Sequence, residues 1–511
     1  MAGHVFVTRS DLRRLALDAW LLPCGLDAQP RPMWVDGAWA LSWPRPTSGW
    51  GRDHRTMRVD GMPPGRATPW LTHVGGGRSA GIDWFMKGVR SFLDAVAADL
   101  GGKSRHDRPR PIVGLPVVGT GAGGARGRAG EVIRAQLAEM YAGAERLDID
   151  CVLVTYDGPT HAAAQAERRR WLRENEASGW PDLDAGLIAV AKGLSRKANR
   201  GQLVLFLGAG ISAGAGLPLW GKLLNELAGR AGMGEEERKA LRKLDVLDQA
   251  EIVEGRMGGS RELMTAAIQE VLSRHEYSLA HAMLAALPVS EVVTTNYDTL
   301  FERASEAGGE MKVAVLPYER AAGADRWVLK LHGCISQTDD IVLTRSDYLR
   351  YGSRRAALSG LVQALLITRH MLFVGFGLTD DNFHRIADAV RQALPSDTDQ
   401  PLGTALMLES GALVEELWDP ELRVVSVGGS DIAQAARRLE ILLDWVLAHT
   451  EQSGAHILDR RYENVLSTEE KELRSVIGDL KVRMDGLSWD AKRTDAYRRL
   501  VKLLESFGSK V

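Results

Sequence analysis

The sequence feature that most constrains the fold is an apolar strand that runs directly into a glycine-rich loop. The stretch reads LVLFLGAGISAGAGLPLW at 203–220, and its first five residues predict a buried strand. Glycines follow at 208, 210, 214 and 216, where a missing Cβ permits a tight turn or close backbone approach. A strand, a glycine turn and a helix can present N–H groups to a phosphate. The loop alone equally fits a purely structural turn.

The glycine spacing does not fit two common nucleotide motifs. It is GxGxxxG rather than the GxGxxG of dinucleotide-binding folds. Gly221 and Lys222 are followed by Leu223, not by the Ser or Thr that a P-loop needs for magnesium. The identity of any ligand must therefore come from residues elsewhere in the chain.

The order of apolar and helical patterns predicts several domains in this chain of 511 residues. We expect an α/β domain at 1–160, a helical linker at 161–182, a doubly wound parallel-sheet domain at 183–429 and a helical region at 430–511. The last region is typical of packing or oligomerisation, and its second helix is expected to start at a capping box. Strands are expected at 20–23, 69–74, 112–118 and 151–157 in the first domain, and at 203–207, 291–295, 327–331, 371–376 and 404–408 in the second; the capping box pairs Ser467 with Glu470.

Composition limits the partners of the chain. The formal net charge is −2, so no basic excess signals nucleic-acid binding. The three cysteines, Cys24, Cys151 and Cys334, are odd in number and far apart, which argues against disulfides and a CxxC zinc clip and favours a reducing cytoplasm. Neither a signal peptide nor an apolar run of about 18 residues is present, so we expect a cytoplasmic protein without membrane segments.

Three further motifs follow the glycine loop in a fixed order: TTNYD at 294–298, KLHGCI at 330–335 and VGFGLTDDNF at 374–383. Together with the loop they resemble the sirtuin family, and most closely the sirtuin-like domains of bacterial antiphage defence proteins. The resemblance implies a Rossmann-like domain with NAD as its substrate. Protein deacylases of the family carry a four-cysteine zinc module after the histidine, whereas the stretch ISQTDDIVLTRSDYLRYGSRR at 335–355 has no cysteine, so we expect no zinc or other metal.

Cleavage of the nicotinamide–ribose bond requires an anchored pyrophosphate, a group that orients a ribose hydroxyl or water, and a base with a pKa near neutrality. Asn296, at a strand end, can orient the ribose and water, and His332 is the natural base. The resemblance implies that Asp298 binds the nicotinamide carboxamide. The expected cofactor-binding residues are Gly208, Ala209 and Gly210, whose N–H groups would anchor the pyrophosphate, with Ser212, Pro218, Trp220, Gly375, Phe376 and Gly377.

Each candidate residue also has a structural interpretation. A lone histidine at a strand end is usually a satisfied structural residue, and Asn296 and Asp298 could form an Asx turn that closes a strand. Only the combination of motifs favours catalysis. Cys334, beside His332, is expected to be a buried core residue rather than a nucleophile.

Residues 111–157 predict a strand, a glycine loop, a helix and a second strand. The segment resembles the macro domain, which binds ADP-ribose and whose corresponding loop cradles the diphosphate. Pro23-Cys24-Gly25 replaces the asparagine pair of macro-domain hydrolases, so hydrolysis is not expected in this domain. An irregular loop at about 28–65, earlier in this domain, is rich in tryptophan. Its indole rings could stack on a nucleotide base, or they could pack the loop against its own domain. The implied regulatory loop is Gly119, Thr120, Gly121, Ala122, Gly123 and Gly124, and the loop tryptophans are Trp34, Trp39, Trp43 and Trp50.

The resemblance implies an antiphage NAD hydrolase that releases nicotinamide and ADP-ribose and depletes NAD during infection. Unregulated hydrolysis would poison the host, so we expect control by the N-terminal domain, through an ADP-ribose-like signal, by a phage-derived activator, by an operon partner protein or by homo-oligomerisation. A zinc-free NAD-dependent deacylase or ADP-ribosyltransferase is an alternative that predicts peptide- or protein-dependent nicotinamide release. A non-catalytic NAD or ADP-ribose sensor is another, and it predicts binding without cleavage.

Overall fold

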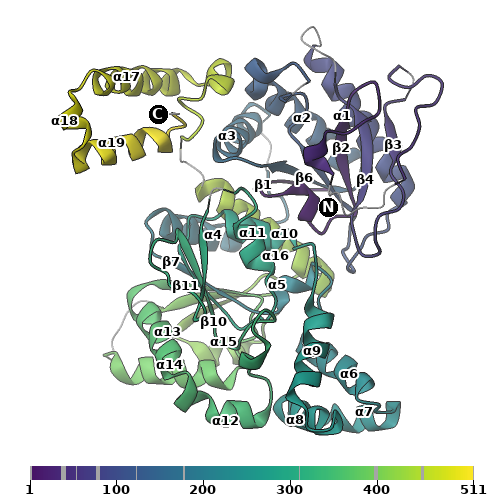
Figure 1. Cartoon of the computed structure of the whole chain (residues 1–511), viewed down its shortest axis with the longest axis vertical. Helices are drawn as coiled ribbons and strands as arrows, with labels where there is room; N and C mark the ends of the chain where they lie inside the picture. Colours follow the sequence, from purple (N-terminus) through teal and green to yellow (C-terminus); the bar gives the residue numbers. More distant parts are fainter. Residues whose placement is uncertain are drawn as a thin grey trace. The chain divides into compact units, whose positions relative to one another are not determined.

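The computed structural model describes residues 3–35, 42–52, 54–75, 81–121, 123–175, 179–309, 311–395, 401–450 and 454–509. The chain divides into two compact units, one of Met1–Asp184 with Leu447–Val511 and the other of Ala185–Val446. Each unit is an α/β domain with one β-sheet, and the chain ends in helices (Figure 1). At this level the expected fold class is confirmed.

The first unit is built on a mixed six-stranded sheet in the order β1-β6-β5-β2-β4-β3. All neighbouring strands are parallel except β3 and β4. Two strands were not expected from the sequence, β1 and the three-residue β3, which is too short to show alternation. The strands are β1 Val5–Arg9, β2 Ala19–Cys24, β3 Thr56–Arg58, β4 Thr68–His73, β5 Ile112–Pro116 and β6 Asp150–Thr155, and the main helices are α1 Ile82–Leu100, α2 Ala129–Leu147 and α3 Gly158–Glu174.

The C-terminal segment packs within the first unit. Tyr462 and Val465, in the 3-10 helix η5 (Arg460–Val465), belong to the same hydrophobic core as the strands and helices α1 and α2. The Tyr462 hydroxyl lies 2.7 Å from Thr160 Oγ1 of α3. Helix α3, which occupies the segment expected as a linker, also buries one face, including Ala163. The boundaries of the four segments predicted from the sequence stay a prediction.

Helices follow η5 to the end of the described chain, as expected, but the third helical pattern is split. The capping box of Ser467 and Glu470 is confirmed, since Ser467 N donates to Glu470 Oε2 at 2.8 Å and Glu470 N donates to Ser467 Oγ at 3.1 Å. Thr494 interrupts the last pattern because its hydroxyl accepts from Tyr497 N and starts a new helix. The helices are α17 Thr468–Asp485, α18 Trp489–Lys492 and α19 Asp495–Ser506.

The second unit is built on a seven-stranded parallel sheet in the order β13-β12-β11-β7-β8-β10-β9. Five strands coincide with the expected ones, and the two edge strands β9 and β13 were not predicted. Both edge strands are only partly buried, so their apolar pattern is weak. The strands are β7 Leu203–Leu207, β8 Glu291–Thr294, β9 Val313–Leu316, β10 Arg326–Lys330, β11 His370–Val374, β12 Gly403–Met407 and β13 Leu422–Ser426.

The strand order of this sheet reverses between β7 and β11. On one side of β7 lie β8, β10 and β9, in that spatial order. On the other side lie β11, β12 and β13, which come later in the chain. In doubly wound sheets, ligands bind outside the carboxyl ends of the strands at such a reversal. The glycine loop follows β7, and the second glycine turn follows β11, so both motifs lie at this point.

A group of four helices, α6 to α9, stands out from the sheet of the second unit (Figure 1), and we call it the helical insert. It consists of α6 Trp220–Arg230, α7 Glu235–Leu241, α8 Val246–Arg256 and α9 Arg261–Leu272. The other helices are α4 Ala185–Asn199, α5 Gly210–Ala213, α10 Leu279–Ala286, α11 Leu300–Ser305, α12 Arg345–Arg354, α13 Ala356–Thr368, α14 Asp381–Ala393, α15 Ala412–Trp418 and α16 Ile432–Thr450, which crosses into the first unit at Leu447.

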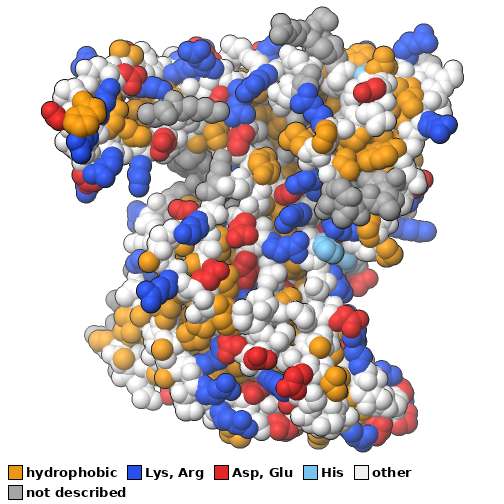
Figure 2. Space-filling model, viewed as in Figure 1, with side chains coloured by type: hydrophobic (Ala, Val, Ile, Leu, Met, Phe, Trp, Pro, Cys, Tyr) orange, Lys and Arg blue, Asp and Glu red, His pale blue; other side chains and the backbone are white. Residues whose placement is uncertain are grey.

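Charged side chains of both signs are interspersed over the face shown in Figure 2, in keeping with the formal net charge of −2. Within the described ranges, no helix is long and apolar enough to cross a membrane.

Candidate active site

A cavity of about 100 Å³ lies at the carboxyl ends of β7, β8 and β10. It brings together most of the residues predicted from the four motifs, although these are far apart in the sequence. The helical insert contributes one wall through α6 and α9. The lining residues are Ala209, Ser212, Leu217, Pro218, Trp220, Leu223, Leu272, Thr295, Asn296, Tyr297, Asp298 and His332.

The two glycine turns pack directly against each other. A Cβ on Gly208 would lie 2.4 Å from the carbonyl oxygen of Gly375 and 2.6 Å from Cα of Phe376. Gly375 has a φ of 66°, and a Cβ there would lie 2.5 Å from the nitrogen of Ile211. Both contacts involve main-chain atoms, which cannot turn aside as a flexible side chain can. These glycines are therefore required for the close approach of the β7 and β11 turns.

Two N–H groups of the glycine loop form main-chain hydrogen bonds in this packing. Gly208 N donates to the carbonyl oxygen of Val374 at 3.0 Å, and Gly210 N donates to that of Gly375 at 2.9 Å. Both N–H groups are thus engaged by main-chain oxygens at the end of β11 and in the turn after it. The expectation that they anchor a pyrophosphate stays a prediction. Ala209, between them, lines the cavity.

Asn296 follows β8 and reaches across to the glycine loop. Its Nδ2 donates to the carbonyl oxygen of Gly208 at 3.1 Å and to Ser212 Oγ at 3.3 Å. Its Oδ1 is buried and accepts no hydrogen bond from any residue that the structure describes. A buried amide oxygen without a donor is costly, so it fits a ligand hydroxyl or an attacking water.

Asp298 lies beside Asn296 in the same turn. Its Oδ1 accepts from Leu300 N at 3.0 Å, which is the Asx-turn bond considered from the sequence. Its Oδ2 accepts from Ser212 Oγ at 2.9 Å, and the side chain still contributes to the cavity. The Asx turn of Asp298 is therefore compatible with a role of this side chain in the site. Asn296 makes no such turn, since its Oδ1 accepts no hydrogen bond from the described residues.

A buried ion pair lies beneath this turn. Lys330, the last residue of β10, pairs with Glu302 of α11 at 2.7 Å. Its Nζ also donates to the main-chain oxygens of Asn296, at 3.2 Å, and Asp298. Burial acts to lower the pKa of Lys330, but the attraction of Glu302 and nearby acidic groups outweighs it and raises the pKa. The protonated lysine thus fixes the backbone that carries Asn296 and Asp298.

His332 follows β10 and is 2% exposed. Its Nε2 lies 3.6 Å from Asp380 Oδ2, and that oxygen accepts from the Tyr348 hydroxyl at 2.7 Å. Burial lowers the pKa of His332, and Arg355 adds to this effect, while Asp380 acts in the opposite direction. The imidazole is therefore neutral near neutral pH, which is the form that a general base requires.

Asp380 is a site residue that the sequence analysis did not single out, although it lies within the VGFGLTDDNF motif. It is the N-cap of α14, where its Oδ1 accepts from Phe383 N at 2.9 Å. The sequence signal that could have identified it is an acidic residue three positions after the second glycine turn, where an N-cap can start a helix. Its proximity to His332 required the fold.

The other predicted residues lie outside the cavity lining. The Phe376 ring packs in the core against Phe206, with ring centroids 4.6 Å apart. Gly375 meets the glycine loop, and Gly377 is exposed. Cys334 is 1% exposed and accepts from Ser336 Oγ at 3.1 Å, as expected of a core residue. The cofactor-binding role expected of Gly375, Phe376 and Gly377 stays a prediction.

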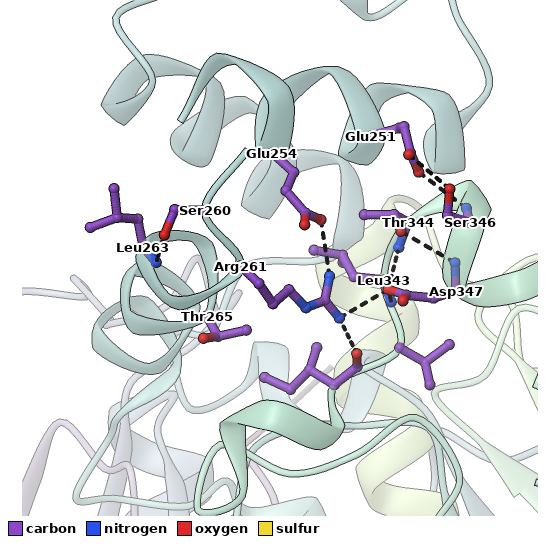
Figure 3. Close-up of polar contacts among 12 residues, drawn as sticks. Glu251, Glu254, Ser260, Arg261, Leu263, Thr265, Leu343, Thr344, Ser346 and Asp347 are labelled. Carbon is purple, nitrogen blue, oxygen red and sulfur yellow. Dashed lines mark hydrogen bonds and ion pairs between the residues drawn. The ribbon is translucent and has the colours of Figure 1, made fainter. Parts of the chain in front are cut away.

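Arg261 ties the helical insert to the segment that follows the catalytic histidine candidate (Figure 3). Its guanidinium pairs with Glu254 of α8 at 3.0 Å and with Asp347 of α12 at 2.9 Å. It also donates to the main-chain oxygen of Ile341. Arg261 is the first residue of α9, and Leu272, the last, lines the cavity. Arg261 therefore holds the helix that forms part of the cavity wall.

The start of α12 completes this network (Figure 3). Asp347 Oδ2 accepts from the main-chain N–H groups of Leu343 at 3.0 Å and Thr344 at 3.1 Å. Ser346 Oγ donates to Glu251 Oε1 of α8 at 2.8 Å. Arg345 of α12 also pairs with Asp248 of α8 at 2.9 Å. The insert is thus joined to this segment at several places by hydrogen bonds to charged groups.

We expect Arg261→Met to raise the KM for NAD several-fold with kcat changed by less than about twofold. Helix α9 forms part of the wall of this cavity, and the Arg261 contacts hold its first residue. Their loss should let this wall move from the binding position and so lower the apparent affinity. Steady-state kinetics measure the effect. Arg256→Met, which breaks an exposed pair with Glu237 inside the insert, is the matched control, and equal KM values for both variants would contradict the expectation.

The predicted regulatory loop of the first unit follows β5. Gly119 has a φ of 72°, and a Cβ on Gly123 would lie 2.6 Å from its Cα, so this loop is also a close main-chain turn. Ala122, like Trp39, lies outside the described residues. Trp50 is 8% exposed, stacks on His73 and donates to the carbonyl oxygen of Leu26, which fits the packing interpretation of that indole.

The described residues contain no group of three or more His, Cys, Asp and Glu side chains that could hold a metal ion.

Residues 290–421 match the SIR2-like domain family, a segment that includes Asn296, Asp298, His332 and Asp380. Three curated relatives are similar to this chain. NAD(+) hydrolase ThsA of Enterococcus faecium is 31% identical over 211 residues, which is 40% of this chain and 43% of that protein. NAD(+) hydrolase ThsA of Bacillus cereus (strain MSX-D12) is 30% identical over 213 residues, with coverage of 40% and 43%. Defense-associated sirtuin 2 of Bacillus subtilis is 26% identical over 220 residues, with coverage of 41% and 21%.

The matched region spans less than half the length of each of these relatives. The chain contains a SIR2-like domain with distant homology to the ThsA NAD hydrolases and to a defence-associated sirtuin. The macro-like character of the first 160 residues stays a prediction.

Proposed function

We propose that this chain hydrolyses NAD at the bond between nicotinamide and ribose, releasing nicotinamide and ADP-ribose. The observation that carries the proposal is the convergence of Asn296, Asp298 and His332 on one cavity at the carboxyl ends of β7, β8 and β10. Neither Asn296 Oδ1 nor His332 Nε2 forms a hydrogen bond within the described part of the chain. Buried polar atoms of this kind are expected where a polar ligand binds. Distant homology to ThsA supports NAD as that ligand.

Each of the three residues has a role in one step of this reaction. The carbon–nitrogen bond breaks with its electron pair moving to the nicotinamide ring nitrogen, which neutralises the pyridinium and leaves positive charge on the ribose. Asn296 holds the ribose or the attacking water, and Asp298 receives the nicotinamide carboxamide. His332 takes the proton that the water loses as its oxygen bonds to the anomeric carbon. The proton then passes to solvent, so one water is consumed for each NAD.

The test incubates the purified chain with NAD and follows nicotinamide and ADP-ribose by chromatography, with and without lysate from infected cells. We expect equimolar products from the wild type and a large loss in Asn296→Ala. Asn464→Ala, an exposed asparagine in the first unit, is the matched control and should retain the wild-type rate. Nicotinamide release that requires an acylated peptide or a protein acceptor would instead support the deacylase or transferase. Bound but uncleaved NAD under every condition would support the sensor.

We further propose that hydrolysis serves antiphage defence through NAD depletion and that the first unit regulates it. The name of one relative, Defense-associated sirtuin 2, supports the first part. The glycine loop after β5 supports the second, since it resembles the diphosphate-binding loop of macro domains. A phage-derived activator, a partner protein or self-assembly is a further means of control.

We expect ADP-ribose to bind the first unit with an affinity that Gly121→Glu lowers at least about tenfold. A carboxylate placed in the loop repels the diphosphate, and no atom lies within 4 Å of the position that the new Cβ would take. Isothermal titration in the Asn296→Ala background measures the affinity without turnover. Gly193→Glu in α4, where a Cβ also meets no neighbour within 4 Å, is the control. Equal affinities in both variants would exclude this loop as the binding site.

A further inference from the structure

The hydroxyl of Ser212 lies among hydrogen-bonding groups from two elements, the turn after β8 and helix α10. Asn296 Nδ2 lies 3.3 Å away and Asp298 Oδ2 lies 2.9 Å away. On the opposite side, His281 Nε2 lies 3.4 Å from the same oxygen. His281 belongs to α10, is fully buried and does not line the cavity. No step of the proposed reaction has used it.

The contacts of His281 Nδ1 favour one tautomer of the ring. Ser278 N–H can only donate, and it points to His281 Nδ1 at 3.2 Å as part of a capping box that starts α10. The Ser278 hydroxyl, which can donate as well, lies 2.8 Å from the same nitrogen. Nδ1 is therefore an acceptor without hydrogen, and the proton of the neutral ring is on Nε2, which faces Ser212. Burial lowers the pKa of His281 to about 4, so this neutral form persists near neutral pH.

The direction of the Ser212 proton follows from its neighbours. Its oxygen receives N–H groups from His281 and from Asn296, so its own proton points to the remaining acceptor, the carboxylate of Asp298. Asn296 offers its free Oδ1 to the ribose or to water, and it shares its Nδ2 between Ser212 and the carbonyl oxygen of Gly208. His281 is the other donor that keeps the hydroxyl directed at Asp298.

We propose that His281 is a positioning residue of this site, whose Nε2–H holds the Ser212 hydroxyl on Asp298 while Asn296 engages the substrate. The proposal rests on the proposed NAD hydrolysis. His281 acts through Ser212 and touches no reacting atom. The same helix start also contacts the glycine loop, because the Ser278 hydroxyl lies 2.8 Å from the carbonyl oxygen of Ile211.

Two conservative variants separate the positioning role from the helix cap. The amide nitrogen of Gln in His281→Gln reaches the place of Nε2 and keeps a donor for Ser212. The amide oxygen of Asn in His281→Asn lies near the place of Nδ1 and keeps the acceptor for Ser278 N–H. We expect His281→Gln to retain kcat/KM for NAD within about threefold, and His281→Asn to lose at least about tenfold. The opposite order would show that only the cap matters and would overturn the proposal.

A double-mutant cycle with Ser212→Ala gives an independent test. In that background, His281→Asn should lower kcat/KM by less than about twofold, because the hydroxyl on which His281 acts is gone. An equal loss in both backgrounds would contradict the proposal. His275→Asn, an exposed histidine just before α10, is the control for the substitution itself, and melting temperatures show which variants are folded.

The same set of variants distinguishes failure of this proposal from failure of the proposed function. If the wild type binds NAD without cleaving it, the hydrolase assignment fails, and the coupling between His281 and Ser212 is read from the Kd for NAD instead. Coupling of less than about twofold in Kd would then overturn the positioning role as well. A wild type that neither binds nor cleaves NAD would overturn both.

Discussion

Replacing His332 with alanine is expected to lower kcat for nicotinamide release by about 10²–10⁴-fold, the range for loss of a general base. The KM for NAD should change far less, since the residue is 2% exposed and contributes little binding surface. Folding should survive, because its Nε2 makes no hydrogen bond within the described residues that the variant would lose. Steady-state rates of nicotinamide release measure the effect. A variant with kcat within threefold of the wild type would exclude His332 as the base.

The pH dependence of kcat should report the same group. A base must be neutral to act, so the rate falls as the pH drops through the pKa of His332, which burial lowers below its ordinary value. Asp380 acts to raise this pKa, and Asp380→Asn removes that attraction. The acid limb of the variant should therefore lie at lower pH than that of the wild type. A shift to higher pH, or none, would contradict the pairing of His332 with Asp380.

Gly208→Ala is expected to destabilise the second unit by about 2 kcal/mol or more, because the new Cβ would overlap main-chain atoms of Gly375 and Phe376. Relief requires the β7 and β11 turns to separate, which also displaces Ala209 at the cavity wall. Hydrolysis should fall together with the urea midpoint of unfolding.

Gly221→Ala is the matched control for this substitution. Gly221 lies in α6, where a Cβ meets no atom within 4 Å, so alanine should stabilise the helix by about 0.5–1 kcal/mol. Similar urea midpoints for Gly208→Ala and the wild type would show that the two turns can separate at little cost.

The interior of the second sheet could be predicted from the sequence because its strands are continuous apolar runs. Leu203–Leu207 is fully buried, and the predicted limits of β7 match the structure. The edge strands β9 and β13 bury only part of their residues, so the apolar pattern that marks a strand is diluted there. The packing of η5 in the first unit could not be predicted from local sequence patterns. Tyr462 contacts Thr160, which is about 300 residues away in the chain.

The site was predictable as a set of residues but not as a set of contacts. The motifs identified Asn296, Asp298 and His332, and the cavity lining includes all three. The glycine loop by itself could not show that its N–H groups bond to the turn after β11, because that turn lies far along the chain. Asp380 and His281 were missed for the same reason: their partners are set by tertiary structure.

The return of the C-terminal segment to the first unit has a consequence for the order of folding during synthesis. The first unit surrounds the second in the sequence, as in a domain insertion. Its core includes Tyr462 and Val465, so residues up to Asp184 emerge from the ribosome without part of their own core. The second unit, Ala185–Val446, is contiguous and can close as soon as it is made. The unit that is synthesised first is therefore the one that completes its folding last.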